Sequence, residues 1–247
     1  MRLVRAELLK LATTRRSLLG YFLAVVAICG LGAAASVGDA SSEERATAEF
    51  GVDLVDVSGF AAIVALLLGL VIVTSEWRHG TITPTLLATP RRERSVLAKL
   101  AAAMVIGAAV AVLALVTVLV VALPWFAILG ETLELGSAFW GRAGRVILAM
   151  VLWCALGAAV GAVVHAQVGA IVGAFLWILV AEPLVGVVLG RLELDGVADH
   201  LPSAALNSLG FDTDGGPGTG TAFAAALAYL VVATGLGILR THRRDVT

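Results

Sequence analysis

The sequence predicts an all-α integral membrane protein with six transmembrane helices, and three observations support this fold class. Apolar residues fill 60% of the 247 positions and charged residues only 14%, against about 45–50% and about 25% in soluble domains. The mean hydropathy is +0.98. Six apolar segments are long enough to cross a bilayer at about 20 residues each. The rest is too short for a second soluble domain, so we expect a single transmembrane domain over residues 1–247.

The six expected spans are separated by charged, polar or Gly/Pro-rich segments. They cover about 17–37, 54–74, 100–123, 144–164, 168–190 and 219–239. The two cysteines, Cys29 and Cys154, both fall inside spans. This placement predicts buried free thiols rather than a disulfide framework.

Residues 1–16 carry five Lys/Arg and one acid, Glu7. Val4, Leu8 and Leu11 recur at helical spacing, which predicts an amphipathic helix on the cytoplasmic membrane surface. A cleaved signal peptide is the alternative, since the first span contains small residues that could form a cleavage site. The long basic segment, its internal Glu and the five further spans favour the surface helix.

Charges on alternate sides of the spans predict the topology. The N-terminus, residues 75–99 and the C-terminus together hold 13 Lys/Arg and four Asp/Glu, whereas the other side holds four and 13. Positive segments stay in the cytoplasm. We therefore expect both termini and the 75–99 loop to be cytoplasmic, and residues 191–218 to form an extracytoplasmic loop.

Two small-residue motifs, Gly157-x-x-x-Gly161 and Gly169-x-x-x-Gly173, lie in the fourth and fifth spans. A three-residue turn at 165–167 joins these spans, so the motifs are expected to pack against each other. The contact could be static helix packing or a moving interface.

One ionisable residue, Glu182, lies deep in an apolar run and is followed by Pro183. A carboxylate at the bilayer centre costs at least about 2.5–3.5 kcal/mol, and proline removes a helical hydrogen bond. One interpretation is a broken helix whose carboxylate lines a translocation path or gate. The other is a helix that ends near residue 181, with a re-entrant piece at 184–190 and Glu182 at the membrane interface.

The 75–99 loop predicts a short helix across the cytoplasmic ends of two spans. Thr83-Pro84 matches an N-cap followed by proline at the first helical position, Leu86 and Leu87 give an apolar face, and Pro90 ends the helix. Such a short helix needs a packing partner. A loop whose arginines bind lipid phosphates is the alternative.

The sequence contains none of the usual catalytic or metal-binding patterns, such as H-E-x-x-H. Its only lysines, Lys10 and Lys99, do not lie in a phosphate-binding G-x-x-x-x-G-K-[ST] loop. We therefore expect no enzyme activity, catalytic residue, metal or cofactor on this chain, and any ATP to be used elsewhere.

The segment Glu76-x-Arg78-x-Gly80-Thr81, followed by Leu86-Leu87-x-x-Pro90 between the second and third spans, resembles the cytoplasmic coupling segment of type-two ATP-binding-cassette permeases. The basic N-terminal helix, the six spans, Glu182-Pro183 and the Leu201-Pro202-Ser203 segment are also similar to that family. The resemblance covers nearly the whole chain, and the size and composition look like small bacterial permeases.

The resemblance implies a half-transporter of the bacterial cytoplasmic membrane, with re-entrant helices between the fifth and sixth spans. Two cytoplasmic ATPase subunits would bind ATP and Mg, and a second permease chain, identical or related, would complete the membrane domain. The cargo would be amphipathic or lipophilic; contacts with membrane lipids are expected and nucleic acid is not. The implied ATPase-coupling residues are Glu76, Arg78, Gly80, Thr81, Thr85, Leu86, Leu87, Pro90 and Arg91.

Two further function classes stay open. An ATP-independent channel or secondary carrier would usually thread more charged groups through the membrane than the single Glu182. A non-transporting membrane anchor for an ATPase would need the same docking segment as an exporter, so the sequence does not separate the two.

Overall fold

The computed structural model describes residues 2–13, 15–81, 92–211 and 218–243, and within these ranges every regular element is helical. Six helical segments are long and apolar enough to cross a membrane, which confirms the predicted number. The elements are α1 (Arg2–Thr13), α2 (Arg15–Asp39), α3 (Ser42–Arg45), α4 (Ala48–Val57), η1 (Ser58–Phe60), α5 (Ala61–Arg78), α7 (Arg92–Leu129), α8 (Ser137–Val164), α9 (Gln167–Leu176), η2 (Trp177–Ala181), α10 (Glu182–Arg191), α11 (Asp195–Ala198), α12 (Pro202–Gly210) and α13 (Thr219–Arg243).

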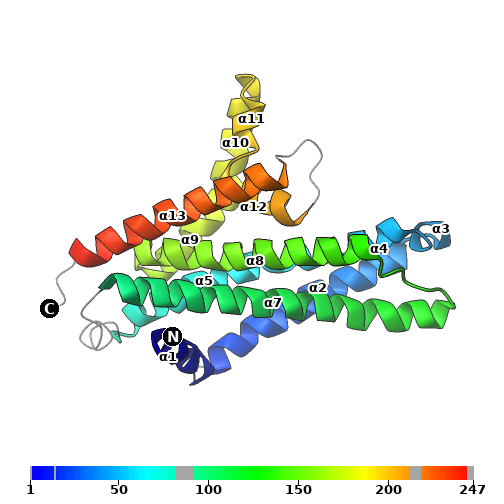
Figure 1. Cartoon of the computed structure of the whole chain (residues 1–247), viewed down its shortest axis with the longest axis horizontal. Helices are drawn as coiled ribbons and strands as arrows, with labels where there is room; N and C mark the ends of the chain where they lie inside the picture. Colours follow the sequence, from blue (N-terminus) through cyan, green and yellow to red (C-terminus); the bar gives the residue numbers. More distant parts are fainter. Residues whose placement is uncertain (1, 14, 82–91, 212–217, 244–247) are drawn as a thin grey trace.

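The long helices α2, α5, α7, α8 and α13 run along the length of the molecule (Figure 1). Helix α8 is the central one, because it packs against α5, α7, α12 and α13. Helix α2 packs mainly on α7, and α1 also packs on α7. Helices α10 and α11 project away from the bundle at its side (Figure 1).

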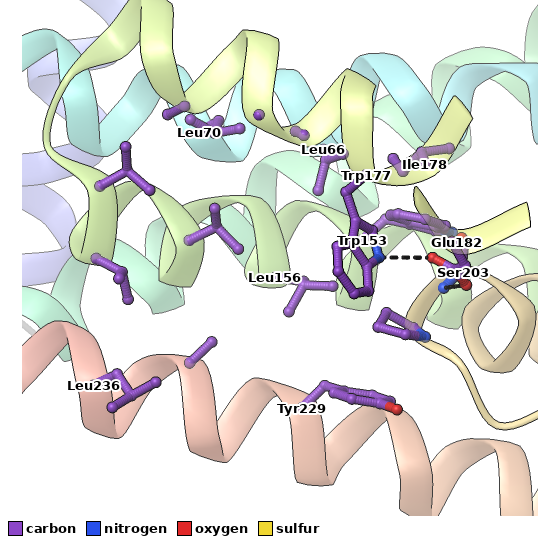
Figure 2. A pocket seen from close by; sticks show the side chains of 18 of the residues that line it. Leu66, Leu70, Trp153, Leu156, Trp177, Ile178, Glu182, Ser203, Tyr229 and Leu236 are labelled. Carbon is purple, nitrogen blue, oxygen red and sulfur yellow. Dashed lines mark hydrogen bonds between the residues drawn. The ribbon is translucent and has the colours of Figure 1, made fainter. Parts of the chain in front are cut away.

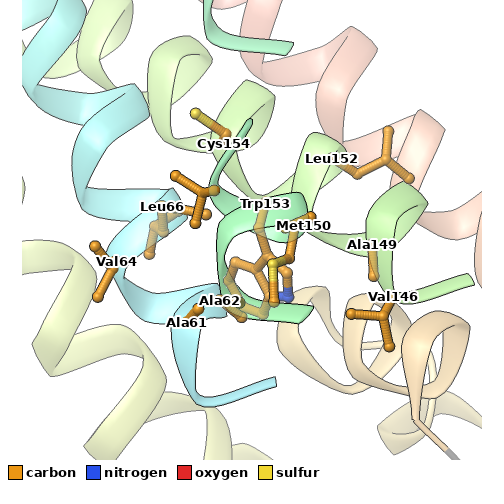
Figure 3. Close-up of a cluster of buried hydrophobic side chains, with 14 of the residues drawn as sticks. Ala61, Ala62, Val64, Leu66, Val146, Ala149, Met150, Leu152, Trp153 and Cys154 are labelled. Carbon is orange, nitrogen blue, oxygen red and sulfur yellow. The ribbon is translucent and has the colours of Figure 1, made fainter. Parts of the chain in front are cut away.

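The core lies between α5 and α8 and consists largely of small and medium side chains (Figure 3). Glycine allows the two backbones to meet: a Cβ at Gly69 would overlap the Cys154 carbonyl, and a Cβ at Gly157 would overlap the Leu66 carbonyl. On α7, a Cβ at Gly107 would lie 2.8 Å from the Met150 carbonyl oxygen. Such close approach raises the number of dispersion contacts, which is how helices associate in a membrane.

This packing corrects the expected pairing of the two glycine motifs. Gly157 and Gly161 lie at a tight contact, but with α5, where a Cβ at Gly161 would be 3.0 Å from the Leu70 carbonyl oxygen. A Cβ at Gly173 would meet nothing within 4 Å, and one at Gly169 would meet only Ala166. Helix α9 diverges from α8 after the turn, so the second motif faces open space.

Several segments expected to be loops are helical. Residues 48–53, expected in a polar loop, form the first part of α4, and the charge-containing segments 75–78 and 92–99 extend α5 and α7 beyond the expected spans. Helix α7 also continues through Pro124, where the third span was expected to end. At 38 residues it is about 57 Å long, well beyond a hydrocarbon core of about 30 Å. Hydropathy marks the apolar part of a helix, whereas backbone hydrogen bonding continues into its charged ends.

Candidate functional site

Four charged side chains meet at the end of the bundle that carries α1. Lys99 Nζ on α7 lies 2.6 Å from Glu76 Oε1 on α5 and 3.2 Å from Glu7 Oε2 on α1. Lys10 Nζ lies 3.1 Å from Glu7 Oε1 and 3.1 Å from Glu76 Oε1. These four residues, which we call the ion cluster, have balanced charges and connect three helices.

Burial differs sharply within the ion cluster. The Lys99 side chain is 4% exposed and the two glutamates 10%, whereas Lys10 is 47% exposed. Burial acts to lower the pKa of Lys10, but hydrogen bonds to Glu7 and Glu76 outweigh it and raise the pKa above 10.5. The contribution of Lys10 to stability is thus fully present below pH 10.5 and is lost as pH rises through its higher folded-state pKa.

The ion cluster adjoins the predicted coupling segment. Helix α5 ends in a Schellman motif, in which Thr81 N–H donates to the Glu76 carbonyl at 3.0 Å and Gly80 N–H to the Trp77 carbonyl at 3.4 Å. Gly80 has φ +68°, the left-handed conformation that favours glycine. The Gly80-Thr81 part of the motif therefore ends α5 and directs the chain out of the bundle.

The other predicted coupling residues divide into two groups. Arg78 is exposed and donates to Gln167 Oε1, at the start of the fifth span, at 3.3 Å. The remaining residues lie in 82–91, outside the described residues: Thr85, Leu86, Leu87, Pro90 and Arg91.

The end of α13 joins the same end of the bundle. Arg92 Nη1 donates to the Thr241 carbonyl at 2.7 Å, and His242 Nε2 lies 3.3 Å from Glu93 Oε2. The segments that the charge count assigns to one side of the membrane thus meet at one end of the molecule. His165, in the turn after α8, is buried there and packs against Trp77, with ring centroids 4.1 Å apart and ring planes tilted by 48°.

At Glu182 the helix neither breaks nor ends. A π-helical turn, η2, joins α9 to α10, and Glu182 N–H donates to the Trp177 carbonyl five residues earlier. The wider turn accommodates Pro183, which cannot donate a backbone hydrogen bond, while the helix continues to Arg191. Both interpretations are therefore wrong about the backbone, because the helix neither breaks at Glu182 nor ends near residue 181.

Glu182 is 6% exposed, and its carboxylate accepts three hydrogen bonds. Trp177 Nε1 donates to its Oε2 at 2.8 Å, and the backbone N–H groups of Ser203 and Ala204 donate to its Oε1 at 2.7 and 3.1 Å. These two amides belong to the first turn of α12, so Glu182 caps a helix that follows it by 20 residues. The cap joins the fifth span to the segment before the sixth.

A cavity of about 410 Å³ opens between α5, α8, α9 and α13, with Glu182 at one end (Figure 2). We call it the inter-helix cavity. Its walls are almost entirely apolar, and its polar groups gather near Glu182, Ser203 and Tyr229, whereas Leu236 lies toward the other end (Figure 2). Gly169 and Gly173 contribute to the wall, which explains why both lack close neighbours.

The opposite end of the bundle holds two separate ion pairs. Arg45 donates to both carboxylate oxygens of Glu131, at 2.7 and 3.1 Å, and also to the Val37 and Ala40 carbonyls. The Arg45 hydrogen bond lowers the pKa of Glu131 below 4.5. These contacts join the loop after α7 to the end of α3 and to the chain at the end of α2.

Arg142 forms the second pair, 3.6 Å from Asp56, and its side chain is 3% exposed. It also donates to the Gly210 carbonyl at 3.4 Å. Arg142 therefore connects α8 to both α4 and the end of α12.

Sequence reasoning identified Glu76 and Glu182 but missed their partners. Composition could have identified these partners. Lys10 and Lys99 are the only lysines in the sequence, and Glu7 is the only acid in the basic N-terminal segment. No sequence signal marks Trp177 or Ser203 as partners of Glu182, since these contacts depend on the π-helical turn.

Within the described residues, no group of three or more His, Cys, Asp or Glu side chains could hold a metal ion. No protein-family model matches the chain. A comparison with curated proteins also finds no match.

Proposed function

We propose that the chain is the membrane-spanning subunit of an ATP-driven exporter. It would form the translocation path for an amphipathic or lipophilic cargo, pair with a second permease chain, and dock two cytoplasmic ATPase subunits through residues 80–90. ATP and Mg would bind to those partners. The proposal rests on the motif at 76–90 and on the geometry around it.

The ion cluster is the observation that carries the proposal. Residues 82–91 connect the end of α5 to the start of α7, and each of these helix ends contributes a buried charge to the cluster through Glu76 and Lys99. Helix α1 joins them through Glu7. A force applied to the segment by a partner would therefore move three helices together, because separating them would leave buried charges uncompensated.

The inter-helix cavity supports the transport part of the proposal. It lies between spans that are far apart in sequence, and its volume falls within the roughly 300–1,000 Å³ typical of ligand pockets. A change in the relative positions of α5, α9 and α13 would change its shape, and α5 is anchored in the ion cluster. This connection gives a mechanical route from the docking segment to a candidate cargo site.

The test is a pull-down of the tagged chain from mild-detergent membranes of its own host, with partners identified by mass spectrometry. We expect a P-loop-containing soluble subunit to co-purify, and to be lost when Leu86 and Leu87 are both replaced by Glu. The matched control replaces Leu192 and Leu194 with Glu, since these exposed leucines lie beyond the opposite end of the fifth span. The control should keep the subunit.

Two results would contradict the proposal. If the wild-type chain purifies alone or only with itself, an ATP-independent channel or carrier becomes the better explanation. If the ATPase binds but reconstituted vesicles show no ATP-dependent movement of any lipophilic cargo, the chain acts as an anchor.

A further inference from the structure

The polar end of the inter-helix cavity holds a carboxyl group that has no ion-pair partner among the described residues. Glu182 is the cavity's one acidic residue, and within the described ranges no Lys, Arg or His side chain forms an ion pair with it. All three of its protein contacts are neutral donors, namely one indole and two backbone amides. Both oxygens act as acceptors.

The carboxylate has acceptor capacity for one more donor. A carboxylate offers about four acceptor positions on its two oxygens. Oε1 uses two of them for Ser203 and Ala204, whereas Oε2 uses one for Trp177. A ligand that donates to Oε2 would therefore complete the hydrogen bonding without displacing a protein contact.

The rest of the cavity suits an apolar body attached to that donor. Leu156 and Leu236 line it farther from Glu182, and Figure 2 shows Trp153 and Tyr229 nearer the polar end. Aromatic faces of Trp and Tyr attract cations in water-poor surroundings. Val232 and Leu236 are more than half exposed, so the cavity opens to the side of the bundle, where a membrane-dissolved ligand would enter.

We propose that the inter-helix cavity binds an amphiphile with a protonated amine, whose ammonium group donates to Glu182 and whose apolar tail lies along α8 and α13. Charge complementarity selects this ligand over a neutral or anionic one, because an anion would face the carboxylate and a neutral tail would leave its charge unpaired. The identification of this ligand as transported cargo rests on the proposed function, whereas its binding to the cavity does not.

The experiment measures binding to the wild-type chain in phosphatidylcholine nanodiscs. The probes are a nitroxide-labelled long-chain primary amine and the alcohol with the same tail, and the readout is quenching of tryptophan fluorescence, since Trp153 and Trp177 line the cavity. We expect the amine to bind about tenfold or more tightly than the alcohol, as a charge-assisted hydrogen bond predicts. Glu182→Gln should abolish this difference.

Two glycine variants control for partition into the lipid. Gly173→Phe fills the cavity from a position where a Cβ has open space, and it should eliminate saturable binding of both probes. Gly20→Phe is its match, since Gly20 is exposed on α2, also has open space and is not in the cavity wall. It should bind both probes like the wild type. These variants keep the test valid even if Glu182→Gln fails to fold.

Equal binding of amine and alcohol to the wild type would overturn the proposal, as would saturable amine binding that survives Gly173→Phe. Adding phosphatidylethanolamine to the nanodiscs then identifies the source of the amine. Competition would identify a bilayer headgroup, and its absence a free amphiphile. Because the ATPase pull-down uses other residues, Glu182→Gln should retain the partner, so failure here is distinguishable from failure of the proposed function.

Discussion

Lys99 should be far more important for stability than Lys10, although both belong to the ion cluster. Lys99 is almost fully buried between Glu7 and Glu76, so Lys99→Met would leave two buried carboxylates that share only the half-exposed Lys10. Removing one partner of a buried ion pair costs about 3–5 kcal/mol. Lys10→Met removes a solvent-screened partner and should cost at most about 1 kcal/mol.

The assay is unfolding in mixed micelles with increasing SDS at pH 7.5, followed by tryptophan fluorescence and circular dichroism. A rescue variant tests the electrostatic reasoning: Lys99→Met combined with Glu76→Gln restores neutrality, because Glu7 then pairs with Lys10. We expect the double variant to regain at least half of the free energy of unfolding that Lys99→Met loses. Equal losses for Lys99→Met and Lys10→Met, or no recovery in the double variant, would refute the reasoning.

Three further outcomes are expected. Gly157→Ala should destabilise the α5–α8 contact by about 1–3 kcal/mol in the same SDS titration, whereas Gly144→Ala, on the same helix but with open space at its Cβ, should be neutral or slightly stabilising; equal effects would contradict the packing. Glu131→Gln should lower the thermal midpoint above pH 4.5, and the gap to the wild type should close as pH falls through the depressed pKa of Glu131; a gap that is constant with pH would exclude the ion pair as its cause. Arg142→Met should cost about 3–5 kcal/mol, as expected for a buried ion, and combination with Asp56→Asn should recover part of that loss in thermal unfolding; two additive losses would contradict the pairing.

The number of spans could be predicted because it depends on composition alone. About 20 apolar residues are needed to cross a bilayer, and the sequence meets that condition six times. Helix ends could not be predicted from hydropathy, since the charged residues that end an apolar run remain helical when they have partners. Glu76 and Lys99 illustrate this: each extends a helix because the other neutralises it.

The site was predicted in part. A carboxylate in an apolar run is conspicuous, so Glu182 was identified as a residue that should avoid lipid. Its actual environment depends on contacts with Ser203 and Ala204, about 20 residues away, and on a π-helical turn that no local pattern signals. The glycine motifs show the same limit, because spacing indicates that a helix face is small but does not identify its neighbour.

The π-helical turn also determines the direction in which the side chains of α10 point around the helix axis. An α-helix advances about 100° per residue, so η2 amounts to one residue inserted into a regular helix, and its loss would turn α10 by about that angle. Deleting Leu179, which is exposed within η2, would then turn the Glu182 side chain from the inside of the protein toward lipid. A different face of α10 would also point toward the rest of the protein. The direction in which the fifth span faces is thus determined by a single residue of chain length.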